Sequence, residues 1–99
     1  MIRISDQVRQ LLARDGLTVR IESDELGETA QVYSAYKPGM AIGWVSPPLY
    51  GSAPPWEAFG VALSPDPNVS IGIFDDLTSA LLSIARYYRA VWLPRYTRQ

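Results

Sequence analysis

The side chains that most often perform acid–base or metal chemistry are missing from this chain. Its 99 residues contain no His and no Cys. This removes the commonest general base, the commonest metal ligand and the Ser–His and Cys–His nucleophile systems. It also excludes disulfides and thiolate metal sites. Any catalytic site would therefore have to be built from carboxylates, hydroxyls or a lysine.

These remaining polar residues do not form a catalytic or metal-binding set. Lys37 is the only lysine and stands in an expected turn, where solvation would keep it from activating a serine. Asp75 and Asp76 are adjacent, which fits the start of a helix better than a shared site. The acid-rich segment 22–28 lacks the spacing of a calcium loop, and the glycines are not in phosphate-loop order. We therefore expect no enzyme, no cofactor and no metal.

Aromatic and arginine side chains remain as candidates for recognition. The chain has three Trp and six Tyr, of which we assign Trp44 and Tyr88 to the core. Protein interfaces are enriched in Trp, Tyr and Arg because these side chains combine a large contact area with a polar group. A Pro-rich segment, 46–56, places Tyr50 and Trp56 as loop contacts. We expect the main partner-binding surface near the C-terminus, at Arg86, Tyr87, Arg89, Trp92, Arg95 and Tyr96.

Charge is distributed unevenly along the chain, although the net charge is only −1. The first 76 residues hold all ten acids, whereas residues 77–99 hold four arginines and no acid. One explanation is that the arginines complement the negative end of a helix dipole and continue into a solvated tail. The other is that they form a small basic contact surface. We also expect a cytoplasmic protein, because no apolar run approaches the ~18 residues of a membrane span and the N-terminus does not resemble a signal peptide.

Two helices are expected, and the longer one organises the domain. Segment 75–93 has apolar residues at alternating spacings of four and three, the period of one helix face: Leu77, Leu81, Ile84, Tyr88 and Val91. Asp75, Asp76 or Thr78 can cap its start, and Pro94 is expected to end it. Segment 5–15 predicts a first helix, capped by Ser5 or Asp6 and ended by Gly16.

Five segments predict strands, at 17–22, 29–36, 40–45, 58–63 and 69–74. Lys37-Pro38-Gly39 predicts a tight turn, and the Pro-containing segment 64–68 predicts a rigid one. The chain is thus expected to be a single α+β domain. It would have two layers, with an antiparallel five-stranded sheet and both helices packed on one face.

The last three expected strands alternate between large and small side chains. Alternate residues of a strand point to opposite faces, so one face should be bulky and the other nearly bare. We expect the bulky set to form the core under the helices. The bare face then contains Gly43, Gly60 and Gly72, which would ease the bending of the sheet or allow a partner or a second copy to approach closely.

These features favour a small non-catalytic protein-binding module, with a homodimer as one form of association. Proteins of this size without His, Cys or a catalytic set are common among phage and mobile-element products. An inhibitor of a bacterial host or defence protein, of the anti-CRISPR type, is therefore the particular form that we expect.

Two alternatives remain open. The α-β-β-β-α order resembles that of the double-stranded-RNA-binding domain, which would imply nucleic-acid binding by the basic, aromatic C-terminal segment. The five expected strands, the single lysine and the acidic balance of the first 76 residues depart from that pattern. A small-ligand or enzyme-accessory role with segment 46–56 as a lid is the other alternative, although few polar side chains converge there.

Overall fold

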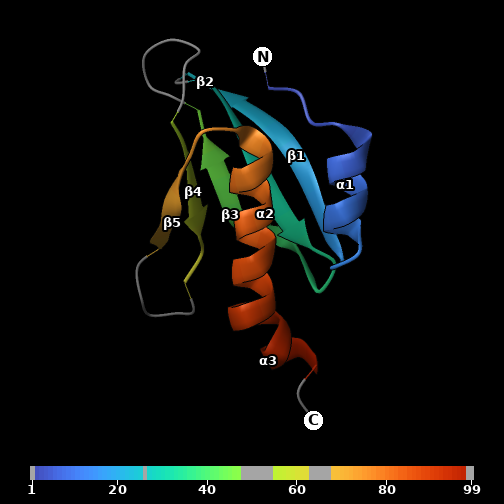
Figure 1. Ribbon diagram of the computed structural model, residues 1–99. Coiled ribbons are helices and arrows are strands. Elements are labelled where there is room, and N and C mark those ends of the chain that lie inside the picture. Colours follow the sequence, from blue (N-terminus) through green and yellow to red (C-terminus); the bar gives the residue numbers. More distant parts are fainter. Residues whose placement is uncertain (1, 26, 48–54, 63–67, 98–99) are drawn as a thin grey trace.

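An antiparallel sheet carries both helices on one of its faces (Figure 1). The computed structural model describes residues 2–25, 27–47, 55–62 and 68–97. Its five strands pair in chain order, each antiparallel to the next. This confirms the expected α+β fold. The strands are β1 (Leu17–Asp24), β2 (Gly27–Ser34), β3 (Lys37–Ser46), β4 (Trp56–Gly60) and β5 (Val69–Phe74).

The two expected helices form and begin with side-chain caps. Helix α1 (Asp6–Ala13) is preceded by Ser5, whose hydroxyl accepts a hydrogen bond from the Val8 N–H at 3.2 Å. Helix α2 (Leu77–Tyr87) is preceded by Asp76, whose carboxylate accepts from the Ser79 N–H at 2.7 Å. Each cap satisfies a backbone donor that the first helical turn leaves unpaired. No helix in the described ranges is both long and apolar enough to cross a membrane.

The C-terminal helix continues past Pro94, so the expectation that this proline ends it is wrong. A π-helical turn, η1 (Tyr88–Trp92), is followed by α3 (Leu93–Thr97), which contains Pro94. The Leu93 N–H donates to the Tyr88 carbonyl, five residues back instead of four. A proline ring inside an α-helix clashes with the carbonyl four residues earlier. The wider π turn relieves that clash and lets the helix continue.

The connection between β2 and β3 also differs from the expected one. The turn is at Ala35 and Tyr36, and Lys37-Pro38-Gly39 belongs to β3. Proline is tolerated at that position because β4 pairs with β3 only over residues 43–46, which leaves the segment around Pro38 on an open edge. Strand boundaries otherwise differ by a few residues. The predicted turn at 64–68 and the loop residue Tyr50 lie outside the described residues, except Asn68.

In the middle of the sheet, small side chains of β3 and β4 face helix α2 in place of Trp44 and Phe59. Ala58 and Gly60 of β4 are buried against α2, whereas Trp44 and Phe59 are partly exposed on the other face. The expectation that the bulky set forms the core is therefore wrong for Trp44 and Phe59. Other members of the bulky set do pack with the core, namely Ile42, Val61 and Ile71. Ile42 does so because an irregularity in the pairing of β2 with β3 turns it inward.

Close packing explains why the helices select the small face. A Cβ atom added at Gly43 would lie 2.9 Å from the side chain of Ile84, and one added at Gly60 would lie 2.6 Å from the ring of Tyr87. At these two positions, the missing side chains of the sheet leave the space that Ile84 and Tyr87 of α2 fill. A Cβ atom added at the third glycine of this set, Gly72, would lie 3.2 Å from the ring of Phe74.

Candidate functional site

The structure divides the expected C-terminal surface into an inward aromatic part and an outward arginine part. The Tyr87 hydroxyl and the Trp92 indole N–H both donate to the carbonyl of Val61, at 3.0 Å and 2.9 Å. Trp92 is only 6% exposed. These two side chains fasten the end of α2 and the π turn to the chain segment that follows β4. They contribute to folding, and a partner would find little of Trp92 to contact.

Tyr96 also packs within the molecule. Its ring stacks on that of Tyr36, with centroids 4.9 Å apart and an interplanar angle of 9°. Its hydroxyl is buried and has no hydrogen-bond partner among the described residues. Burial raises the pKa of Tyr96, with a smaller contribution from nearby Tyr88. The Trp92 ring has a neighbouring cation as well, because the ammonium group of Lys37 lies 5.7 Å from its centre.

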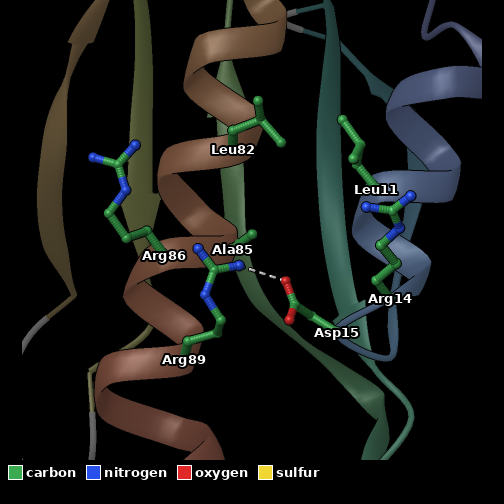
Figure 2. Close-up of a pocket in the computed structure, with 7 residues that line it drawn as sticks. All are labelled: Leu11, Arg14, Asp15, Leu82, Ala85, Arg86 and Arg89. Atoms are coloured by element: carbon green, nitrogen blue, oxygen red, sulfur yellow. Dashed lines mark hydrogen bonds and ion pairs between the residues drawn. The ribbon is translucent and has the colours of Figure 1, made fainter.

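The arginines of the expected surface remain exposed, and two of them line a hollow of about 360 Å³ (Figure 2). This hollow lies between α1 and α2, two elements that are far apart in the sequence. Arg95 lies farther along, in α3, and does not line it. The lining consists of apolar side chains and ionised ones, namely Leu11, Arg14, Asp15, Leu82, Ala85, Arg86 and Arg89.

One ion pair joins the two sides of this hollow (Figure 2). The Arg89 guanidinium donates to the Asp15 carboxylate, with Nη1 and Oδ2 2.6 Å apart. Arg89 is on the π turn, and Asp15 is in the turn that follows α1. The Arg89 side chain is 48% exposed, so one side of its guanidinium remains open to solvent. Asp15 thus neutralises only part of the positive charge around the hollow.

The other two arginines have no charged partner in the described part of the chain. Neither the Arg14 nor the Arg86 side chain makes a hydrogen bond or ion pair there. In Figure 2, the Arg14 guanidinium lies beside Leu11, on the α1 side of the hollow. The Arg86 guanidinium points away from α1, so its stem lines the hollow while its charge lies farther out. The lining residues therefore include three positive charges and one negative charge.

The floor of the hollow is apolar. Leu11 of α1 and Leu82 of α2 lie across from each other, with Ala85 one turn further along α2 (Figure 2). Leu11 and Leu82 are partly exposed, whereas Ala85 is buried. An apolar floor beside guanidinium groups suits a ligand that carries both an apolar group and a carboxylate or phosphate.

The other expected contact residues have mainly structural positions. Trp56 begins β4 and packs, partly buried, against the core. Tyr50 is not among the described residues. Gly43 and Gly60 do permit a close approach, but it is the approach of α2, so the face that contains them is not open to a partner.

Sequence reasoning missed the contribution of the first helix to the hollow. Leu11, Arg14 and Asp15 come from the end of α1 and the turn after it, more than sixty residues before Arg86 and Arg89. The adjacent Arg14-Asp15 pair is a weak signal by itself, because charged residues are common at helix ends. Only the packing of α1 beside α2 brings these groups together. Comparisons of the chain with protein-family models, curated proteins and solved structures find no match, so any function must be argued from this geometry.

Proposed function

We propose that this protein is a small non-catalytic protein-binding module that holds an acidic segment of a partner protein in the hollow between α1 and α2. The observation that carries the proposal is the charge around the hollow, where Arg14, Arg86 and Arg89 are opposed by a single carboxylate. This local excess of positive charge contrasts with the whole chain, whose net charge is −1. It would attract an acidic segment and disfavour a basic one.

The shape of the hollow supports a peptide segment as the ligand. Leu11 and Leu82 present apolar surface on opposite sides of this hollow of about 360 Å³. A suitable partner helix or strand has an apolar residue flanked by carboxylates. The apolar residue would lie between the leucines, and the carboxylates would lie near the guanidinium groups. Arginine suits this role because its planar group binds a carboxylate through two parallel hydrogen bonds.

A module of this kind acts by occupying a surface of its partner. That mode of action requires no general base or metal, in keeping with a chain that has no His and no Cys. An inhibitor of a larger protein is one form of such a module, because blocking a surface is sufficient for inhibition. The partner-binding residues of the proposal are thus Arg14, Arg86 and Arg89, with Leu11 and Leu82 as apolar contacts.

The proposal can be tested with two fluorescent peptide libraries. One contains Glu and apolar residues, and the other has Gln in place of every Glu. We expect wild-type protein to select peptides from the first library, and Arg14→Glu with Arg86→Glu to weaken their binding by about tenfold. Arg3→Glu combined with Arg95→Glu is the matched control, because it makes the same charge change at two exposed residues that do not line the hollow.

Three outcomes would overturn the proposal. Equal binding of both libraries would show that carboxylates are not recognised. An equal loss of affinity in the control variant would show that only net charge matters. Tighter binding of a generic DNA or RNA duplex, with a steep dependence on salt, would instead assign the arginines to phosphate contacts.

A further inference from the structure

The face of the sheet opposite the helices carries its own set of large side chains. Register places these outward positions in rows, in which Thr18 pairs with Tyr33, Trp44 with Phe59, and Glu57 with Ile73. Both helices lie on the other side of the sheet (Figure 1). Within the described ranges, no helix or strand covers these rows.

The middle of this face is apolar and aromatic. Trp44 and Phe59, on the neighbouring strands β3 and β4, stack with ring centroids 5.2 Å apart and planes at 17°. Ile73, on β5, is 63% exposed, the most exposed of the large apolar side chains in the described ranges. A pair of stacked rings beside an exposed isoleucine is a larger apolar surface than scattered single residues would give.

The border of this face is polar and contains charges of both signs. The Arg20 guanidinium, on edge strand β1, lies 4.7 Å from the centre of the Tyr33 ring. The Tyr33 hydroxyl donates a hydrogen bond to Glu22, also on β1. Glu57, on β4 and directly opposite Ile73 of the edge strand β5, accepts from the Ser70 hydroxyl at 2.8 Å. An apolar centre with a polar, solvent-exposed border is the usual anatomy of a protein–protein interface.

We propose that two copies of this chain pair through this face, with the Trp44–Phe59 stack at the centre of the contact. In a two-fold interface both copies contribute the same surface, so the positive groups of one copy must face the negative groups of the other. The border meets this requirement, because Arg20 of one copy can be placed against Glu22 or Glu57 of the other. Single-stranded nucleic acid, which also stacks on exposed rings, is disfavoured because both carboxylates would repel its phosphates.

The size of the face implies a weak dimer. Five strands spaced about 4.8 Å apart, with about six residues each at 3.3 Å, give a face of roughly 480 Å². Two copies would bury about twice that area, close to the lower limit of about 1,000 Å² for a specific interface. We therefore expect dimerisation that depends on concentration. This face and the α1–α2 hollow are on different sides of the molecule, so pairing would leave the hollow accessible.

Analytical ultracentrifugation of wild type and two variants tests the inference, over protein concentrations from about 10 μM to about 1 mM. Ile73→Lys places a charge on the open face. Val69→Lys is the matched control, because Val69 is on the same strand and 40% exposed but pairs with Gly60 on the helix side. We expect wild type and Val69→Lys to dimerise, and Ile73→Lys to weaken dimerisation by about tenfold or more. Circular dichroism melts confirm that each variant is folded.

Two results would overturn the inference. One is a wild-type protein that remains monomeric at the highest concentration. The other is an Ile73→Lys variant that dimerises as tightly as Val69→Lys, which would place the contact elsewhere.

As a second test of the face, Arg20→Glu should also weaken the dimer, because it leaves only acids on the border. An unchanged dimerisation constant for Arg20→Glu would contradict the charge arrangement proposed here.

Discussion

The hydroxyl groups of Ser34 and Tyr88 lie 2.9 Å apart, and both residues are almost completely buried. Ser34 ends β2 and Tyr88 begins the π turn, so the bond joins the sheet to the C-terminal helix. The Ser34 hydroxyl also accepts from the Tyr36 N–H at 3.2 Å. Because the two hydroxyls satisfy each other, both can be buried without leaving an unpaired polar group.

Replacing either hydroxyl should therefore destabilise the protein. We expect Tyr88→Phe and Ser34→Ala each to lower the free energy of unfolding by about 1–3 kcal/mol, because each leaves a buried polar group without this partner. The double variant should lose less than the sum of the single losses. Urea denaturation of the four proteins measures the coupling. Strict additivity would show that the bond does not connect the two residues energetically.

A second prediction follows from the close packing around the glycines under α2. Gly43→Ala should destabilise the protein by about 1–3 kcal/mol. The new Cβ would lie 2.7 Å from the Phe59 carbonyl oxygen, a backbone atom that cannot move without disturbing the pairing of β3 with β4. Gly39→Ala is the control, because a Cβ there meets nothing within 4 Å. Thermal melts should separate the two variants clearly, and equal melting temperatures would mean that neither the Phe59 carbonyl nor Ile84 packs closely against Gly43.

The ion pair between Asp15 and Arg89 predicts opposite effects on stability and on binding. Asp15→Asn should cost less than about 1 kcal/mol of stability, because the Arg89 side chain is 48% exposed and solvent screens the pair. If the α1–α2 hollow binds acidic peptides, the same change should tighten that binding several-fold by removing a competing carboxylate. Asp75→Asn, which removes the same charge from an exposed residue outside the hollow, should leave binding unchanged. Equal tightening in both variants would point to net charge alone.

Stability should fall in alkaline solution because two tyrosines have raised pKa values. The hydrogen bond to Glu22 raises the pKa of Tyr33 above its ordinary value of 10.0, and burial adds a smaller effect. Burial also raises the pKa of Tyr96. The folded protein thus holds these protons more tightly than the unfolded chain. Their contribution is fully present below about pH 10 and is lost as the pH rises through the folded-state pKa values.

Denaturation curves measured from neutral to alkaline pH provide the check. Tyr33→Phe and Tyr96→Phe should each make the alkaline loss of stability less steep, because one proton no longer contributes to the linkage. Tyr96→Phe should also be no less stable than wild type at neutral pH, since the Tyr96 hydroxyl is buried without a partner in the described ranges. An unchanged slope in both variants would show that these tyrosines titrate alike in the folded and unfolded chains.

The order of the elements could be predicted from the sequence because it depends on neighbours along the chain. Ser5 and Asp76 cap their helices, and Gly16 adopts the left-handed conformation with a φ of 73°. These are local effects of side chains on nearby backbone groups. Pro94 misled the prediction, because proline usually ends a helix and the π turn that accommodates it leaves no simple signature.

Which face of the sheet became the core was decided only by tertiary structure. Alternation divides a strand into two sets of side chains, but it does not say which set a helix will cover. Here Ile84 and Tyr87 of α2 fill the space above Gly43 and Gly60, so the small face is buried and Trp44 and Phe59 remain outside. The sizes of the side chains alone predict the opposite arrangement, with Trp44 and Phe59 in the core.

The candidate site shows the same division between local and tertiary information. Its C-terminal arginines, Arg86 and Arg89, stand out in the sequence because no acid follows Asp76. The Arg14-Asp15 pair and the apolar floor join them only when α1 packs beside α2. Sequence by itself determined the types of side chain and the order of helices and strands, through short-range capping and periodicity. Tertiary structure alone decided which of these side chains meet, because close packing selects among long-range arrangements that local preferences leave equal.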